Sequence, residues 1–278
     1  RRALICALAS LLLALVRIAA IGVAPAGATG ATFDITHYNL CSRHCSYDHV
    51  YGATKTHFGV TPVNEMLWTI GSRGREPRAI SLNEVCVEAW WTAVAGLPSY
   101  YNTYFLAARN FSSDPGCVNF GNLISVRSLG NWGALYHCFT DGNGSAPGCA
   151  PTIDDQGEYR LAICTKSEIY LEVFAACTAH VTGSSQATTY RSVVDGWFGS
   201  SPRLALGDLN VYNSVPAFPN NGYTDAFAGL NTFVDEDMIV RHIDYGYLHQ
   251  DDLDGPDTDD NYAGSSDHHL LFAGIHFK

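Results

Sequence analysis

The stretch LALGDLNVY, Leu204–Tyr212, places polar side chains at the end of an apolar run. Its first three residues are typical of a buried strand, a glycine follows them, and Asp208 and Asn210 come next. An unpaired buried polar group costs about 1–3 kcal/mol, and a buried charge costs more. The stretch therefore indicates a carboxylate and a carboxamide with a specific task at a strand end.

The same arrangement recurs elsewhere along the chain. In each case a polar side chain lies at the end of, or inside, an otherwise apolar segment. These residues are Asn39 in ITHYN, Glu84 in AISLNE, His180 in VFAACTAH, Asp244 in RHIDY, and Asp267 with His268 in SSDHHLLFA. One such residue is usually a cap or a satisfied core group. So many of them predict strand ends that converge on one polar pocket.

The chemistry of this set is coherent. Asn39, Glu84 and Asp267 offer hard oxygen ligands, which suit Mg²⁺, Mn²⁺ or Ca²⁺. Two histidines and an aspartate can move protons and stabilise charge. The set contains no cysteine, which argues against a zinc thiolate centre.

Seven short motifs follow one another along the chain: YNL, LNEV, FGNLIS, TAHV, GDLN, IDYGYL and SDHHL. In this order they resemble the endonuclease/exonuclease/phosphatase superfamily, the DNase I-like fold, and the likeness runs from Asn39 to His268. It implies an α/β protein in which two packed mixed β-sheets are flanked by helices, a four-layer sandwich. The pattern of short strands in both hairpin and strand–helix order independently favours mixed sheets.

The resemblance implies roles for the metal-side residues. Asn39 and Glu84 would hold the divalent metal, with Asp267 nearby in the same cluster. Asp208 would orient or activate the attacking water, and Asn210 would help to fix the phosphate.

It also implies roles for the histidines. His180 would donate a hydrogen bond to the phosphate or act as an acid. His268 would pair with Asp244, and this dyad would act as a base or as a phosphate contact. Asn122 in FGNLIS matches a motif near the substrate, but the glycine before it could simply permit close backbone approach, so a functional role for Asn122 is left open. Which histidine is the acid also stays open.

The sequence departs from the family pattern at four places. Asn83 stands where glutamine is usual, Ala179 replaces a common threonine, and His242 replaces an arginine. Cys41 stands where some relatives have a second acidic ligand, which argues against two metals. None of these changes removes a central group, so we expect an active enzyme.

Other polar and aromatic residues receive structural interpretations. We expect His37, His242, His269 and His276 to be strand residues, with ordinary hydrogen bonds or simple packing. The aromatics of CVEAWW and SYYNTYF are expected in the core. The acidic segment 251–266 contains six aspartates and is interpreted as a solvated surface loop, with a structural calcium site as the alternative.

The first 28 residues are typical of a secretory signal. A basic start, Arg1 and Arg2, precedes an apolar run, and the small residues of APAGA suit cleavage after about Ala28. A retained membrane anchor is the alternative, but Arg17 would cost a few kcal/mol within a bilayer. We therefore expect an extracellular protein with one catalytic domain over residues 29–278.

Cysteine usage agrees with export. Cys6 lies in the expected signal, and eight cysteines remain: Cys41, Cys45, Cys86, Cys117, Cys138, Cys149, Cys164 and Cys177. An even set in an exported chain predicts disulfides, and Cys138 with Cys149 is a plausible local pair. The segment CSRHC, residues 41–45, could instead hold zinc, but no second cluster at zinc-like spacing accompanies it.

Charge and localisation narrow the function. Without the expected signal the chain has 13 lysines and arginines against 27 aspartates and glutamates, a net charge of −14, which disfavours loose binding to polyanions. We expect a monomeric, secreted, metal-dependent phosphodiester hydrolase, most simply an endonuclease acting on DNA or RNA. Phosphate contacts could come from Arg73, Arg75, Arg78, Arg109, Arg127 and Lys166 if folding gathers several on one face.

Two alternatives remain. A sphingomyelinase-like phospholipid phosphodiesterase would need an exposed apolar element to enter the membrane surface. The sequence shows no obvious apolar hairpin tip, and NSVPAFPNNGY, residues 213–223, is a weak candidate. A catalytically inactive secreted binding protein on the same scaffold is the other alternative. In every case we expect no stable membrane insertion after signal cleavage.

Overall fold

The computed structural model describes most of the chain. The described residues are 32–41, 60–74, 76–110, 117, 119–139, 160–169, 172–199, 201–212, 215–234, 237–249, 253–263 and 265–278. The expected signal, Cys45 and Cys149 lie outside these ranges. Within them, no helix has the length and apolar character needed to span a membrane.

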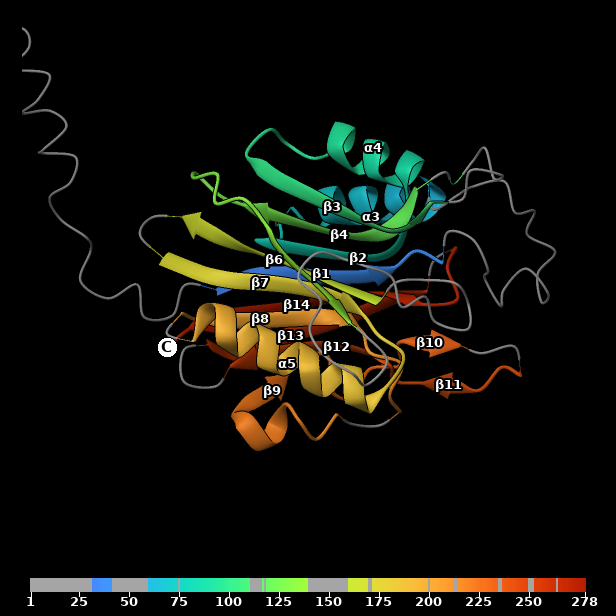
Figure 1. Cartoon of the computed structure of the whole chain (residues 1–278). Helices are drawn as coiled ribbons and strands as arrows, with labels where there is room; N and C mark the ends of the chain where they lie inside the picture. Colours follow the sequence, from blue (N-terminus) through green and yellow to red (C-terminus); the bar gives the residue numbers. More distant parts are fainter. Residues whose placement is uncertain are drawn as a thin grey trace, which may run out of the picture.

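Two six-stranded sheets form the centre of the molecule (Figure 1). In the first sheet the strands lie in the order β13 (Leu253–Ala263), β14 (His269–Phe277), β1 (Thr32–Asn39), β2 (Ala79–Cys86), β4 (Asn119–Arg127) and β3 (Tyr101–Asn110). In the second the order is β5 (Leu135–Phe139), β6 (Arg160–Ile169), β7 (Glu172–His180), β8 (Arg203–Asp208), β12 (Asp244–His249) and β9 (Tyr223–Asp225). The pairs β1–β2 and β7–β8 are parallel and the other pairs are antiparallel, so both sheets are mixed.

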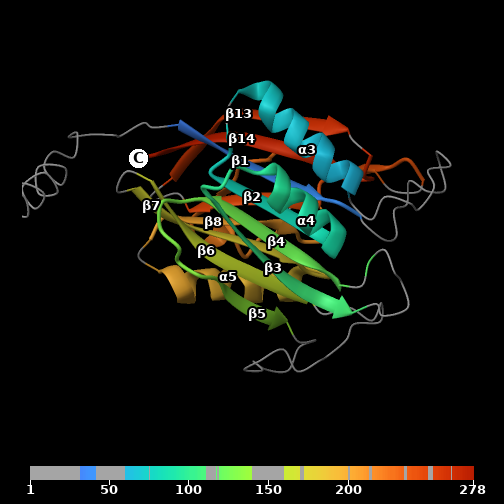
Figure 2. The ribbon, with the colours of Figure 1, turned by 90° about the horizontal axis from the view of Figure 1, so that it is seen from above.

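Helices cover the outer faces. Helices α3 (Val60–Arg73) and α4 (Val87–Gly96) lie over the first sheet, and α5 (Ser184–Phe198) lies over the second (Figure 2). A one-turn helix, η1 (Pro219–Asn221), precedes β9. The result is the expected four-layer sandwich.

The apolar core lies between the two sheets and beneath each helix layer. Ile35 of β1 and Leu204 and Leu206 of β8 belong to the cluster between the sheets. Ala205, between the two leucines, packs toward α5 in another cluster. Strand β8 is thus buried on both faces, which explains why it appears as a continuous apolar run rather than an alternating one.

Gly207 lets β7 and β8 approach closely just before Asp208. It pairs with Ala179, its φ is +148°, and a Cβ on it would lie 2.0 Å from the Ala179 carbonyl oxygen. We expect Gly207→Ala to lower the free energy of unfolding by at least about 3 kcal/mol, because backbone cannot move aside cheaply. Urea denaturation checks this. The matched control is Gly196→Ala in α5, where a Cβ meets nothing within 4 Å; it should stabilise by roughly 0.5–1 kcal/mol. Similar stabilities for the two variants would contradict the strain.

One expectation about these elements was wrong. The acidic segment is not a surface loop, because most of it forms the edge strand β13. Strands β6 and β7 pair as far as Ile169 and Glu172. Residues 238–248 contain two strands: β11 (Val240–Arg241), which pairs with β10 (Phe233–Val234), and β12.

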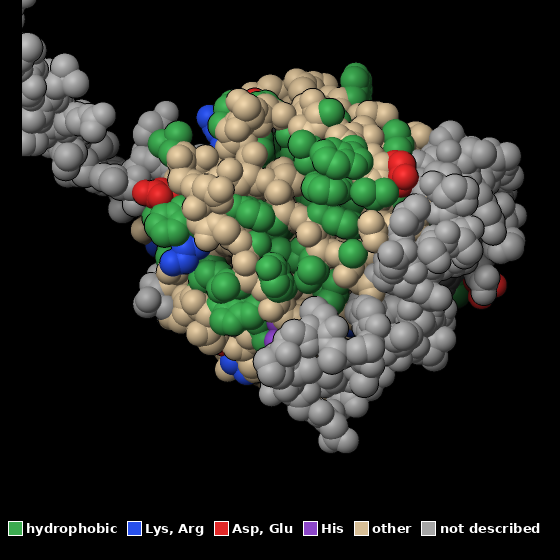
Figure 3. All heavy atoms as spheres, turned by 45° about the horizontal axis from the view of Figure 1, so that its top comes forward, with side chains coloured by type: hydrophobic (Ala, Val, Ile, Leu, Met, Phe, Trp, Pro, Cys, Tyr) green, Lys and Arg blue, Asp and Glu red, His purple; other side chains and the backbone are tan. Residues whose placement is uncertain are grey.

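The surface carries more aromatic residues than expected. Trp91 is 59% exposed and Tyr100 is 37% exposed, so assigning them to the core was wrong, whereas Tyr101 is buried. Trp90 stacks between Trp91 and Phe105. Figure 3 shows apolar side chains gathered on one face with few charged groups among them.

The ribbon β10–β11 projects from one end of the sandwich (Figure 1). Met238, Ile239 and Val240 are each about half exposed on it. The expectation of no apolar hairpin tip was therefore wrong. The earlier candidate, residues 213–223, instead buries Phe218 and Tyr223.

The described cysteines are disulfide-bonded. Cys86 bonds Cys117, and Cys164 bonds Cys177 across β6 and β7. Cys41 and Cys138 are disulfide-bonded as well. Cys41 is therefore no thiolate ligand, and the disulfide interpretation of CSRHC is favoured; the pair Cys138–Cys149 extends beyond the described residues.

Candidate active site

The polar strand-end residues lie at one end of the sandwich. Asn39 ends β1, His180 ends β7 and Asp208 ends β8, while Asp244 begins the antiparallel β12 directly opposite Asp208. Glu84 lies near the same end of β2, and His268 immediately precedes β14. Residues distributed over more than two hundred positions therefore meet at the edge shared by both sheets.

Two carboxylates converge near His180. Asn39 donates from Nδ2 to Glu84 Oε1 over 3.1 Å and to Asp208 Oδ2 over 3.0 Å. His180 Nε2 lies 3.7 Å from each of the same two oxygens. Ligand atoms of Glu84, His180 and Asp208 all lie within 4.8 Å of one another, so this group could hold one cation.

Asn39 and Asp267 differ from their expected placement as oxygen ligands. Asn39 Oδ1 accepts the Cys41 backbone N–H at 3.0 Å, so it is the amide nitrogen that faces the carboxylates. Asp267 belongs to neither group of possible ligands among the described residues; its Oδ1 lies 4.0 Å from His268 Nε2. The second such group is Asp208, Asp244 and His268.

The backbone presents Glu84 through an irregularity. The pairing of β2 with β4 shifts register between Leu82 and Val85, and Glu84 has φ of +53°. A non-glycine residue in the left-handed region costs about 1–2 kcal/mol. Asn210 also has positive φ, +49°, but asparagine tolerates that conformation better. Cys41 and Met238 also have positive φ, so four described non-glycine residues adopt this conformation, and two of them, Glu84 and Asn210, belong to the site.

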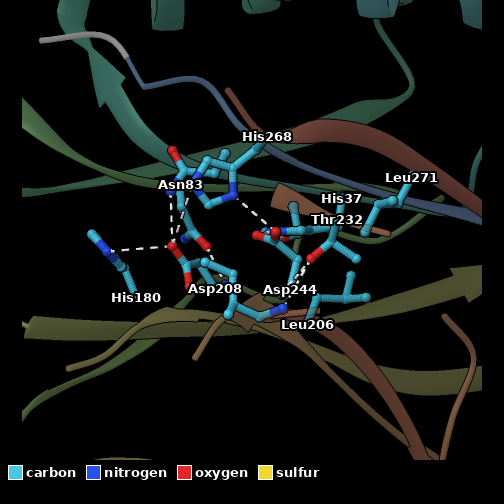
Figure 4. Close-up of polar contacts among 12 residues, drawn as sticks. His37, Asn83, His180, Leu206, Asp208, Thr232, Asp244, His268 and Leu271 are labelled. Atoms are coloured by element: carbon cyan, nitrogen blue, oxygen red, sulfur yellow. Dashed lines mark hydrogen bonds and ion pairs between the residues drawn. The ribbon is translucent and has the colours of Figure 1, made fainter. Parts of the chain in front are cut away.

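His268 and Asp244 form a buried ion pair, as Figure 4 shows. Their Nδ1 and Oδ2 atoms are 2.8 Å apart. Burial opposes a charge on His268, but the Asp244 carboxylate outweighs it and raises the pKa of His268 to about 10. Burial likewise opposes ionisation of Asp244, yet the imidazolium holds the pKa of Asp244 below its usual range. His268 is therefore a cation at neutral pH.

His180 has the opposite character. Burial, reinforced by the positive charge of Arg160, holds the pKa of His180 well below its usual value. One guanidinium nitrogen of Arg160 lies 2.7–2.8 Å from both ring nitrogens. His180 is thus a neutral side chain that can donate or accept a hydrogen bond.

Asp208 is held between these groups. Burial and the charge of Asp244 raise the pKa of Asp208 to about 7. The Asn210 backbone N–H donates to Asp208 Oδ1 over 2.9 Å, and the Asn210 side-chain amide donates to the Val181 carbonyl. The hydrogen bond from the Asn210 backbone therefore orients the Asp208 carboxylate at the end of β8.

Asn122 and Asn83 form an interior hydrogen-bond pair. Asn83 Nδ2 donates to Asn122 Oδ1 over 3.0 Å, and Asn122 Nδ2 donates to the Leu161 carbonyl. Asn83 Oδ1 in turn accepts the Asp208 backbone N–H at 2.9 Å. Asn122 is buried with both ends of its amide satisfied, so it supports Asn83. The neighbouring Gly121 permits close approach, because a Cβ there would lie 1.9 Å from the Leu106 carbonyl oxygen.

Three residues at the site were not anticipated as functional. His37 Nε2 lies 3.0 Å from Asp244 Oδ1, and Arg160 lies against His180. The Phe233 ring lies 4.7 Å from the His268 ring. In the sequence each of the three looks like an ordinary strand residue, so no local signal marks it.

This chain resembles known proteins in its structure rather than in its sequence. No protein-family model matches the sequence, and no curated protein matches it either. A Bacteroides vulgatus endonuclease/exonuclease/phosphatase superposes with a TM-score of 0.66 at 14% identity, covering 89% of this chain and 100% of that one. This chain has the endonuclease/exonuclease/phosphatase fold.

Other structures of this fold match similarly. D. rerio TDP2 complexed with single-strand DNA product has a TM-score of 0.63 at 11% identity, covering 88% of this chain and 99% of that one. The human Nocturnin catalytic domain with bound sulfate has a TM-score of 0.61 at 11% identity, covering 90% and 95%. At these identities the likeness shows the endonuclease/exonuclease/phosphatase fold alone.

Proposed function

We propose that this chain is a divalent-metal-dependent phosphodiesterase that hydrolyses nucleic acid. The observation that carries the proposal is the meeting of Glu84, His180 and Asp208 within 4.8 Å, beside the Asp244–His268 pair. The similar structures add support, since they include a protein bound to a DNA product and a mannosyl-6-phosphatase.

The donor set fits a hard divalent cation. Glu84 would hold it, because its Oε1 faces the same point as Asp208 Oδ2. Asn39 could join through Oδ1 if its amide turned. When bound, the metal supplies charge neutralisation at the phosphate and a Lewis acid for the reacting oxygen.

The protein groups supply the rest of the chemistry. Asp208 orients the attacking water and accepts its proton. The imidazolium of His268 stabilises charge on a phosphate oxygen, and neutral His180 donates a hydrogen bond to the same group. In this proposal His268, rather than His180, carries the positive charge.

The described cations at the site are few. Arg78 precedes β2 and Arg127 ends β4, both at the far end of the first sheet, and Lys166 lies on β6 away from Arg160, so these three are not gathered at the site. Arg160 contacts His180, and Arg241 stacks over Tyr212 near the β8 end. We therefore expect contact with only a few phosphates.

This charge distribution predicts a shallow salt dependence. A plot of log(kcat/KM) for DNA against log[salt] should have a slope no steeper than about −3, since each neutralised phosphate contributes about −0.9. A small phosphodiester serves as the control, with a slope near zero. A slope steeper than about −5 for DNA would contradict local recognition.

A phospholipid phosphodiesterase is the second candidate, favoured by the exposed apolar residues Met238–Val240, because the ribbon that carries them contacts His268 through Phe233. Purified protein is assayed with plasmid DNA, RNA, sphingomyelin vesicles and a small phosphodiester, with and without EDTA. Chelator-sensitive cleavage of DNA or RNA supports the proposal. Lipid cleavage without nuclease activity, reduced by Ile239→Ser, supports the second candidate. No chelator-sensitive cleavage would favour a binding protein.

Secretion is tested separately, by N-terminal sequencing of the exported protein.

A further inference from the structure

We propose that His37 is a positioning residue, which holds Asp244 and through it orients His268. The inference rests on the proposed function only where activity is measured. His37 lies on β1 of the first sheet, and Asp244 lies on β12 of the second, so the contact joins the two sheets directly behind the site. Both side chains are completely buried.

The Asp244 carboxylate is shared between two imidazoles. Oδ2 accepts from His268 Nδ1 at 2.8 Å, and Oδ1 accepts from His37 Nε2 at 3.0 Å. Figure 4 shows the two rings approaching the carboxylate together. The Asp244 backbone N–H donates to Thr232 Oγ1 and leaves the side-chain torsions free. The carboxylate plane is therefore set by the two histidines.

A chain of hydrogen bonds holds His37 itself. Its Nδ1 lies 2.7 Å from Ser81 Oγ, which lies 2.6 Å from Thr178 Oγ1. Asn83 Nδ2 donates to Thr178 Oγ1 over 3.2 Å. Because an amide nitrogen only donates and a carboxylate only accepts, one consistent order runs from Asn83 through both hydroxyls to His37 Nδ1, with the His37 proton on Nε2.

This chain connects the two halves of the site. Asn83, which begins it, also accepts the Asp208 backbone N–H. All of its members are fully buried, so no water competes for their bonds. Supporting partners of this kind typically change activity 10–100-fold when they are removed.

The activity test compares three variants on a small aryl phosphodiester. His37→Phe keeps a planar ring without nitrogens and should lower kcat 10–100-fold with KM changed less than about threefold. His37→Gln can donate to Asp244 and accept from Ser81, and should restore kcat to within about fivefold of wild type. Thr36→Val is the matched control, because Thr36 is buried on the same strand and donates to the Leu271 carbonyl. It should lose stability while keeping kcat.

A double-mutant cycle separates positioning from general damage. In an Asp244→Asn background, His37→Phe should lower kcat less than about threefold, because the contact it acts through is already altered. An equal loss in both backgrounds would overturn the proposal, as would a His37→Phe variant with wild-type kcat.

Histidine side-chain NMR tests the contact without any substrate. The His37 Nε2–H signal should be protected from exchange and should shift in Asp244→Asn. A signal that exchanges freely or does not shift would overturn the inference. Absence of phosphodiester cleavage by the wild type would instead contradict the proposed function, so the two failures are distinguishable.

Discussion

Replacing Glu84 by glutamine is expected to lower kcat for phosphodiester cleavage about 10³-fold while changing the free energy of unfolding by less than about 1 kcal/mol. The glutamine oxygen can still accept from Asn39 Nδ2, so the hydrogen bond at Oε1 persists. What disappears is the negative charge of Glu84, whose carboxylate faces the same point as the carboxylate of Asp208. Activity and stability should therefore separate at this residue.

A metal-dependent readout makes the expectation specific. Mg²⁺ or Mn²⁺ should raise the melting temperature of the wild type, since a ligand that binds only the folded state stabilises it, and Glu84→Gln should lose that shift. Glu168→Gln is the matched control. Glu168 lies near the end of β6 opposite Arg160, which is the end at the site. An unchanged kcat, or an unchanged metal shift in Glu84→Gln, would show that this carboxylate does not hold the cation.

Strand ends made most of the site predictable. A strand such as β8 can be recognised as buried from its continuous apolar run. A polar residue at the end of that run must therefore lie at the edge of the sheet where the strand ends. Because parallel neighbours end at the same edge, His180 of β7 and Asp208 of β8 could be assigned to one place without knowing any distance. The fold class followed from the same periodicity and from the ordered motifs.

The edge strand β13 was missed for a physical reason. Edge strands carry charges that discourage pairing with other chains, so their residues lack the apolar alternation of central strands. Here the charge also has partners: Arg73 contacts Asp260 at 2.7 Å. Six aspartates with a Gly-Pro pair therefore predicted a loop where a ladder to β14 supplies the stabilisation.

His37 was missed because its partner is 207 residues away. A histidine inside an alternating strand has the same pattern whether it packs, binds backbone or fixes a carboxylate. Only the register of β1 within one sheet and of β12 within the other brings it to Asp244. Arg160 raises the same difficulty, since its contact with His180 depends on how β6 pairs with β7.

The pH profile of the wild type should distinguish a charged from a neutral role for His268. The pKa of His268 is about 10, so the imidazolium is present throughout the neutral range and disappears only as the pH rises through that value. If the charge contacts the phosphate, kcat/KM should stay high up to about pH 9 and fall above pH 10. If His268 acted as a base, activity would instead rise with pH across the same interval.

Substitution of Asp244 should move the alkaline fall of the pH profile to lower pH. Asp244→Asn removes the carboxylate that raises the pKa of His268, so the alkaline fall should begin at lower pH, and kcat at pH 8 should drop about 10²–10⁴-fold. His268→Gln should give a comparable loss without an alkaline limb from this group. His276→Gln, near the far end of β14, should match the wild type. An alkaline limb that stays in place in Asp244→Asn would show that the pair does not set the charge used in catalysis.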